Sequence, residues 1–266
     1  MAFANVTRAC TGAAVPDLRR LSDRFAEAAS KCGSIADLRS LLVGATEELG
    51  FKFFALLHHA SLRNPSGALV RIDNYPESWS AEFIAKGFDR SDPVHWVSRR
   101  SSFAFRWSEL GRLTQLEGEG AVILERSRGF GLGEGVTVPF NVPGEPSGSC
   151  SFVAGAGHEI PAERIQYAEW MGARAFEAAR RIVSPRPAGS PPHLSRRELE
   201  CLRLVAAGKA DGEIAVILGL SADTVSQYVK RARAAYDVTT RTQLVVLGLR
   251  DGRIGFEEAL DPRSGD

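Results

Sequence analysis

The sequence predicts an α+β protein in two parts, an N-terminal α-β-α sandwich with an antiparallel sheet and a C-terminal all-α domain. The first observation is a proline-rich segment, residues 184–192, whose four prolines exclude a helix or a central strand. The second is that helical spacing alternates with strand-like runs before this segment, whereas only helical spacing follows it. We therefore expect an N-terminal domain over residues 16–183, a linker over 184–192 and a C-terminal domain over 193–256. The alternative for the proline-rich segment is a long surface loop within one domain.

Helices and hairpins succeed one another in the N-terminal part. Apolar residues recur at helical spacing from Leu18 to Cys32 and, after a helix start at Ser34, from Leu38 to Leu49. Two pairs of strand-like runs follow, the first pair joined by a turn at residues 64–67 and the second by a turn around Pro143 and Gly144. The expected strands are residues 51–60, 68–75, 135–141 and 149–155, and the expected helices are 77–86 and 161–183. This order favours an antiparallel sheet covered by helices.

Composition and charge exclude several classes of protein. The chain has 266 residues, of which 44% are hydrophobic and 24% charged, and its net charge is +1, which is ordinary for a globular protein. No apolar run reaches the ~18 residues of a membrane span, and no apolar signal core follows Arg8. We therefore expect no membrane partner. The four cysteines are scattered without a CxxC pair, so we expect no disulfide framework or zinc site, and reduced thiols in a cytoplasmic protein.

Three helices are predicted in the C-terminal domain. Ser195 and Glu198 have the spacing of a capping box at the start of the first helix, and Gly208 fits its C-terminal cap. A second short helix ends in a tight turn at Gly219, and a third runs over about residues 224–236. A short turn between two short helices, the second one polar and basic, is the helix-turn-helix arrangement that binds DNA. A generic three-helix domain with a solvated face is the alternative that the pattern leaves open.

The third of these helices divides its side chains between the core and solvent. Val225 and Val229 lie four residues apart and are expected to point into the core, while hydroxyl, amide and basic side chains that can reach bases or phosphates cover the rest. Between His193 and Arg253 there are ten basic and seven acidic residues, a mild local excess of positive charge. The residues we expect to contact DNA are Lys209, Thr224, Ser226, Gln227, Lys230, Arg231 and Arg233.

The C-terminal domain resembles the LuxR-type DNA-binding domain along its whole length. The matching segments are LSRRELECL at 194–202, AGK at 207–209, EIA at 213–215, IL at 217–218, LS at 220–221, TV at 224–225 and DV at 237–238, followed by Arg241 and Gln243. The resemblance implies that the helix of residues 221–233 enters the major groove. It also implies structural roles for Glu198, Leu202 and Gly208. Tyr228 departs from the pattern, since histidine is commoner in the family at that position.

The N-terminal domain resembles the autoinducer-binding domain of quorum-sensing LuxR regulators over roughly residues 18–182. The matching segments are NYPESW at 74–79, Phe83, Asp92-Pro93, FRWS at 105–108 and the glycine-rich stretch 131–139. The positions typical of that domain correspond to Trp79, Phe83, Asp92, Pro93, Trp107 and Gly135. Phe83 departs from the family, which usually has tyrosine there. Because phenylalanine lacks the hydroxyl, we expect a slightly more apolar pocket.

The resemblance implies an N-acyl-homoserine lactone as the ligand, and the polar residues suit its chemistry. The indole N–H of Trp79 is a donor only and suits the lactone carbonyl, whereas the carboxylate of Asp92 accepts and suits the amide N–H. Tyr75 can donate to the acyl carbonyl. Ser151 is expected to contact the acyl group from the sheet, and Ser149 is the second choice for that contact.

An apolar wall is expected from Phe54, Phe103 and Trp107, with Phe83 beside the polar residues. Trp107 and Gly135 also have an architectural alternative. Pro93 is expected to shape its loop without touching the ligand, and Asp92-Pro93 could form a simple turn.

Other chemistries have little support in the sequence. Residues 128–135 are glycine-rich, but a strand-like run follows, so a structural turn is favoured over a dinucleotide-binding loop. His58 and His59 are neighbours on a predicted strand and therefore point to opposite faces. No Ser-His-Asp or Cys-His arrangement is recognisable. We expect no enzyme, no metal and no cofactor besides the signal ligand.

The hypothesis is a ligand-responsive transcriptional regulator of quorum sensing. Its expected partners are a small autoinducer, operator DNA with an inverted repeat, a second copy of the chain in a homodimer, and RNA polymerase. The nearest alternative is a LuxR-type regulator that is ligand-independent or reads a non-lactone small molecule. An enzyme acting on acyl amides or lactones and a protein with interaction function only are the alternatives from other classes.

Overall fold

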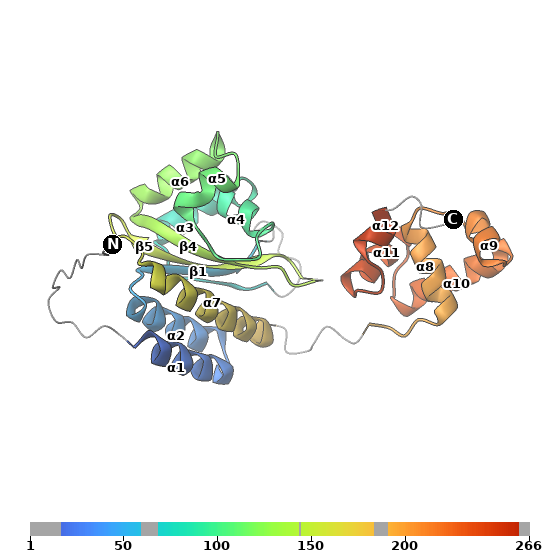
Figure 1. Cartoon of the computed structure of the whole chain (residues 1–266), viewed down its shortest axis with the longest axis horizontal. Coiled ribbons are helices and arrows are strands. Elements are labelled where there is room, and N and C mark those ends of the chain that lie inside the picture. Colours follow the sequence, from blue (N-terminus) through green and yellow to red (C-terminus); the bar gives the residue numbers. More distant parts are fainter. Residues whose placement is uncertain (1–16, 60–68, 144, 184–190, 261–266) are drawn as a thin grey trace, which may run out of the picture. The chain divides into compact units, whose positions relative to one another are not determined.

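The computed structural model describes residues 17–59, 69–143, 145–183 and 191–260. The chain forms two compact units that meet along the sequence between Val183 and Ser184. The N-terminal unit is a sheet with helices on both faces, and the C-terminal unit is helical (Figure 1). The predicted fold class is confirmed. The predicted turn at residues 64–67 lies outside the described residues.

The sheet is antiparallel throughout and does not follow chain order. Its strands are β1 (Phe53–His58), β2 (Arg71–Asp73), β3 (Phe105–Arg106), β4 (Leu132–Phe140) and β5 (Gly148–Gly155). Their order across the sheet is β2-β1-β5-β4-β3. The long connection from β2 to β4 therefore carries the helices that cover one face. The sequence predicted β1, β4 and β5 closely, placed β2 within a longer run, and did not predict the short edge strand β3.

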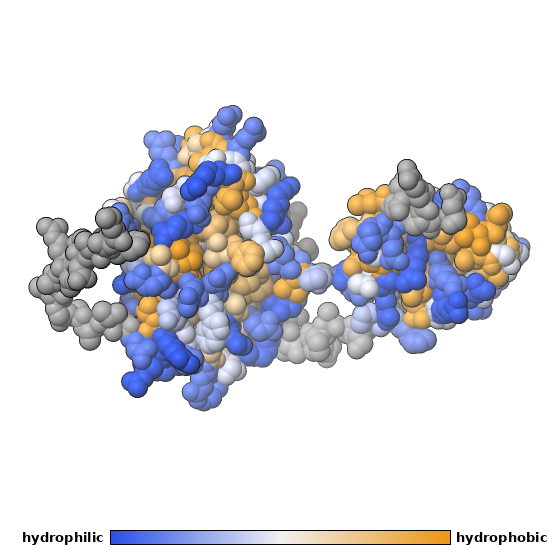
Figure 2. Space-filling view, in the orientation of Figure 1, coloured by the Kyte–Doolittle hydropathy of each residue, from blue (hydrophilic) through white to orange (hydrophobic). Residues whose placement is uncertain are grey.

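One face of the sheet packs on α2 (Ile35–Glu48) and α7 (Ala162–Val183), and α1 (Leu18–Lys31) packs on these two helices. Ser34 caps α2 through its side chain, as its position in the sequence predicted. Arg181 of α7 donates to the carbonyls of Ala29 and Cys32, which ties the last turn of α7 to the end of α1. On the face shown in Figure 2, hydrophilic residues predominate over α1 and α2, as expected for amphipathic helices.

The other face carries shorter elements: α3 (Glu77–Lys86), α4 (Pro93–Ser98), α5 (Leu110–Leu113), α6 (Glu119–Gly129) and the 3-10 turns η1 (Phe88–Arg90) and η2 (Trp107–Glu109). Of these, sequence patterning predicted only α3. Pro93 is the first residue of α4, where the missing N–H costs nothing, and Asp92 caps the helix by accepting from the Val94 N–H at 2.8 Å. Asp92-Pro93 therefore begins a helix, whereas the sequence favoured a loop at Pro93.

The C-terminal unit consists of α8 (Arg196–Ala206), α9 (Asp211–Leu218), α10 (Ala222–Ala235), α11 (Arg241–Arg250) and α12 (Phe256–Leu260). The predicted capping box is present, since the Ser195 N–H donates to the Glu198 carboxylate at 2.8 Å and the Glu198 N–H donates to the Ser195 hydroxyl. Gly219 ends α9 in the left-handed conformation, φ 65°, and makes the tight turn into α10. Leu202 and Val225 are fully buried in the shared core.

No helix among the described residues is long and apolar enough to cross a membrane.

Gly135 on β4 is a position where the fold leaves no room for a side chain. A Cβ there would lie 2.5 Å from the indole ring of Trp107, which packs across the strand. We predict that Gly135→Ala lowers the free energy of unfolding of the N-terminal unit by about 1–3 kcal/mol, because overpacking forces the indole to move. All four tryptophans belong to this unit, so urea unfolding followed by tryptophan fluorescence measures it in the full chain.

Gly44→Ala is the matched control. Gly44 lies within α2, and no heavy atom stands within 4 Å of the place that a methyl group would take, so alanine is expected to raise stability by up to about 1 kcal/mol through helix propensity. Equal stability of Gly135→Ala and the wild type would contradict the close packing of Trp107 on β4.

Candidate ligand-binding cavity and DNA-binding helix

A cavity of about 330 Å³ lies between the sheet and the helices α3, α4 and α6. Its floor comes from the alternate residues of β1, β2 and β5 that face away from α7. The strand register arranges the residues on this face of the sheet in rows, and some members of each of the second and third rows line the cavity. The first row holds Phe53, Val153 and Gly135, the second holds Asp73, Ala55, Ser151 and Thr137, and the third holds Arg71, Leu57, Ser149 and Pro139. Adjacent rows are two residues apart along a strand, about 7 Å.

A chain of hydrogen bonds runs along the second row. The Trp107 indole donates to the Thr137 hydroxyl at 2.9 Å, and Thr137 and Ser151 are joined through their hydroxyls at 2.9 Å. Ser151 also lies close to the phenol of Tyr75. Burial raises the pKa of Tyr75 well above its usual range, and the nearby Asp92 carboxylate adds to this rise. The phenol therefore stays protonated at neutral pH and can serve as a donor.

Aromatic rings close the cavity near the first row. Trp79, on α3, is buried and packs against Phe83 with ring centroids 5.7 Å apart and against Phe130 at 5.5 Å. Phe88 completes this cluster, together with Phe53 of the floor. Both Trp79 and Phe83 line the cavity. The structure therefore brings Tyr75, Trp79, Phe83, Asp92, Trp107 and Ser151 together around one space.

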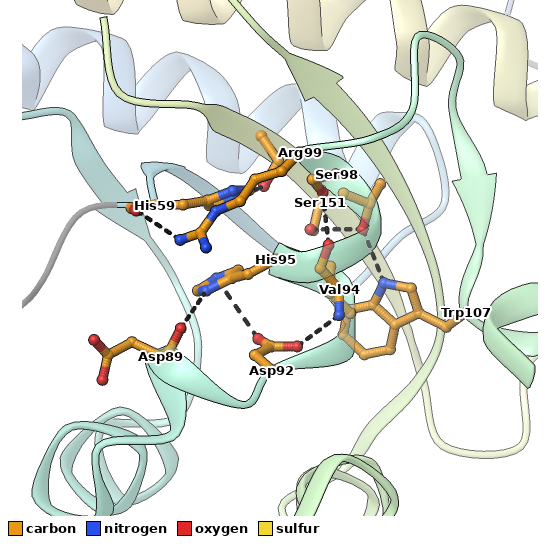
Figure 3. A network of polar contacts seen from close by, with 11 residues as sticks. His59, Asp89, Asp92, Val94, His95, Ser98, Arg99, Trp107 and Ser151 are labelled. Carbon is orange, nitrogen blue, oxygen red and sulfur yellow. Dashed lines mark hydrogen bonds and ion pairs between the residues drawn. The ribbon is translucent and has the colours of Figure 1, made fainter. Parts of the chain in front are cut away.

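Asp92 and His95 face each other across the first turn of α4 (Figure 3). One carboxylate oxygen of Asp92 caps the helix, and the other lies 3.6 Å from Nε2 of His95. The opposite ring nitrogen of His95 lies 3.4 Å from the carbonyl oxygen of Asp89. Both side chains line the cavity. A buried carboxylate needs such partners, because leaving it unpaired in a dry site is costly.

His59 follows β1 and stacks on His95, with ring centroids 4.2 Å apart and an interplanar angle of 22° (Figure 3). Its Nε2 lies 2.8 Å from the Ser149 hydroxyl, and Arg99 donates to its carbonyl. Burial, aided by the neighbouring His95 and Arg99, lowers the pKa of His59 to about 2, so its ring is neutral. His58 packs instead against Phe176 of α7, so the two rings contact opposite sides as predicted, and His58 also lines the cavity.

Sequence reasoning missed His95 as a residue that lines the cavity, and His59 as the ring that stacks on it. The spacing Asp92 to His95 is one helical turn, but that signal is visible only if a helix is expected at Pro93. The pocket is also less apolar beside Phe83 than the sequence suggested, since the His95 ring lies edge-on to Phe83 at 5.9 Å.

Two of the predicted wall residues are wrong. Phe54 is fully buried but does not line the cavity, because it alternates with Phe53 and Ala55 and therefore faces the α7 side of the sheet. Phe103 is 78% exposed on the connection before β3 and does not line the cavity either. Ala55 and Leu57 supply the apolar floor in their place.

The remaining family positions have structural surroundings. Pro93 is buried at the start of α4 and does not line the cavity, as predicted. Trp107 both lines the cavity and bonds Thr137, so its indole N–H already has a partner. Gly208 adopts φ 80° after α8 and lets Lys209 turn toward α9.

Six of the seven predicted DNA-binding residues lie on α10, and Lys209 lies in the connection between α8 and α9. Val225 and Val229 are buried and hold the helix on the core, whereas Ser226, Gln227, Lys230 and Arg231 are exposed. Thr224 and Lys209 are half-buried, and the Thr224 hydroxyl bonds the capping Ser221 at 2.8 Å. Arg233 differs from the others, because its guanidinium donates to the Thr239 carbonyl and holds the end of α10.

Within the described parts of the chain, no group of three or more His, Cys, Asp and Glu side chains has an arrangement that could hold a metal ion. Cys32, Cys150 and Cys201 are free thiols, and Cys10 lies outside the described residues.

Both parts of the chain match known protein families. Residues 34–181 match the family model for the autoinducer binding domain, and residues 192–247 match the model for bacterial regulatory proteins of the luxR family. The chain is 28% identical over 222 residues to the transcriptional activator protein AhyR of Aeromonas hydrophila, covering 81% of this chain and 85% of AhyR. It is also 28% identical over 213 residues to the regulatory protein SdiA of Escherichia coli, covering 78% of this chain and 86% of SdiA.

A crystal structure of Escherichia coli SdiA has the same fold, with a TM-score of 0.64 at 24% identity, covering 90% of this chain and 100% of that chain. The chain belongs to the LuxR family of quorum-sensing transcriptional regulators, which are not enzymes, and combines an autoinducer-binding domain with a helix-turn-helix DNA-binding domain.

Proposed function

We propose that the chain binds an N-acyl-homoserine lactone in its N-terminal domain, residues 16–183, and operator DNA as a homodimer through its C-terminal domain, residues 193–256. The observation that carries the proposal is the convergence of Tyr75, Trp79 and Asp92 on one cavity. Its volume of about 330 Å³ is at the lower end of ligand pockets, which span ~300–1,000 Å³. A small acylated lactone suits that space.

Each polar group of such a ligand has a matching partner in the cavity. The Trp79 indole N–H suits the lactone carbonyl. The Asp92 oxygen that does not cap α4 suits the amide N–H, and the protonated phenol of Tyr75, close to Ser151, suits the acyl carbonyl. Because the Tyr75 phenol and the Asp92 carboxylate line the cavity, a ligand without an amide and a carbonyl would cover them and return fewer hydrogen bonds, which favours the lactone over a plain fatty acyl chain.

On the DNA side, we propose that α10 enters the major groove with Ser226, Gln227 and Lys230 toward the bases. Arg231, Lys209 and Thr224 would then contact phosphates, and Arg233 would support the helix end. A two-fold dimer would read an inverted repeat with half-sites about one helical turn, ~34–36 Å, apart. Operator binding and contact with RNA polymerase would take place in the cytoplasm.

Control by the ligand requires that the ligand favours one state of the protein over another. A ligand that occupies the cavity stabilises the folded N-terminal unit by mass action, in proportion to its concentration over its Kd. It changes DNA binding only if the DNA-competent state has the higher ligand affinity.

Asp92→Asn tests the ligand contact without removing the cap of α4, because asparagine caps helices as well as aspartate does. We predict a loss of affinity for N-hexanoyl-L-homoserine lactone of roughly 10- to 100-fold, since a hydrogen bond to a charged group is lost. Isothermal titration calorimetry on the full chain measures it. Glu125→Gln, on an exposed carboxylate of α6 that does not line the cavity, serves as the control and should change affinity little. Unchanged affinity in Asp92→Asn would contradict the role of Asp92.

Lys230→Ala tests the placement of α10. We predict a three- to tenfold loss of operator affinity. If Lys230 contacts a phosphate, the slope of log affinity against log salt concentration should also become shallower by about one. Electrophoretic mobility shift at several salt concentrations measures both.

Arg196→Ala removes the same charge from α8, where Arg196 pairs with Glu200 at 2.9 Å, and should leave operator binding nearly unchanged. Equal effects of the two substitutions would indicate general electrostatic attraction and count against insertion of α10 into the groove.

A further inference from the structure

The third row of the cavity floor is polar where an alkyl tail would meet it. Ser149 lines the cavity and is buried, two residues from Ser151 on the same strand and on the same face. The two hydroxyls are therefore about 7 Å apart along β5. Leu57 flanks Ser149 on β1 and Pro139 flanks it on β4, with Arg71 beyond Leu57 on β2, so the Ser149 hydroxyl lies between two apolar neighbours.

His59 holds Ser149 in place and also supports His95. Its Nε2 is 2.8 Å from the Ser149 hydroxyl, and its ring is stacked on the His95 ring, which lines the cavity. The ring is neutral and the carbonyl of His59 is held by Arg99 (Figure 3). Three side chains from β1's end, β5 and α4 thus form one cluster, which we call the His59–Ser149–His95 cluster.

This cluster has hydrogen-bonding capacity left over. A serine hydroxyl donates one hydrogen bond and accepts two, and the contact with His59 uses one of these. The long 3.6 Å and 3.4 Å separations at the His95 nitrogens leave that ring weakly bonded within the protein. Covering these groups with an alkyl chain would remove water from them and return no hydrogen bond.

We propose that the cavity selects an acyl-homoserine lactone whose acyl chain carries a hydroxyl about 7 Å beyond the amide carbonyl, where it bonds Ser149 and His95. This inference rests on the proposed function and names the ligand more closely. With the acyl carbonyl at Tyr75 and Ser151, a chain that follows β5 for one row reaches Ser149. His59 acts as a positioning residue, because it contacts Ser149 and His95 and does not line the cavity.

Two synthetic ligands of equal length test the inference. N-(6-hydroxyhexanoyl)-L-homoserine lactone and N-heptanoyl-L-homoserine lactone differ only by a terminal hydroxyl in place of a methyl group. We expect the full chain to bind the hydroxylated lactone about five- to tenfold more tightly in calorimetric titration, the gain of a hydrogen bond to a buried group. Ser149→Ala should reduce the ratio of the two affinities, hydroxylated over heptanoyl lactone, to one or below. His59→Phe, which keeps a stacked ring but frees Ser149, should reduce it in part.

Ser98→Ala is the matched control. Ser98 is also buried, does not line the cavity, and its hydroxyl bonds the Val94 carbonyl of its own helix at 2.7 Å, so the ratio of the two affinities should stay as in the wild type. Equal or tighter binding of the heptanoyl lactone by the wild type would overturn the inference and leave the proposed function standing. An unchanged ratio in both Ser149→Ala and His59→Phe would also overturn it. Binding of neither lactone would overturn the proposed function and the inference together.

Discussion

The buried carboxylate of Asp92 contacts both helix α4 and the interior of the cavity. One oxygen caps α4 and so fixes the start of the helix that carries Val94 and His95 over the sheet. The other oxygen lies at the cavity beside His95. A charge in this position is costly unless it is bonded on both sides. The amide of a ligand and the helix N-terminus would share one buried anion, which ties the order of α4 to occupancy of the cavity.

The fold could be predicted wherever a short stretch of sequence specifies its own ends. Ser34 and Ser195 cap helices locally, Gly219 makes its turn through a left-handed conformation, and β4 and β5 are marked by strand composition. The connection from β2 to β4 was not predictable in this way. Its helices α4, α5 and α6 are short and bury residues against a cavity, so they lack a regular apolar stripe. Their positions depend on contacts such as that of Trp107 with Thr137, which come from distant parts of the sequence.

The site was predictable only in part, for related reasons. Resemblance to the family pointed to Trp79, Tyr75 and Asp92. Strand alternation explains why Phe54 faces α7 and not the cavity, while Phe103 is exposed on the connection before β3. His59 and His95 have no motif, since their pairing depends on the end of β1 meeting α4 across the sheet.

Mass spectrometry of small molecules extracted from the full-length protein, purified from cells grown beside the strain that carries its gene, tests the central claim most directly. The account predicts a lactone recovered intact in near-stoichiometric amount, with the fragment ion of homoserine lactone, and its loss from protein carrying Asp92→Asn. Recovery of a non-lactone compound at the same stoichiometry, or of the lactone in equal amount from the Asp92→Asn protein, would contradict it.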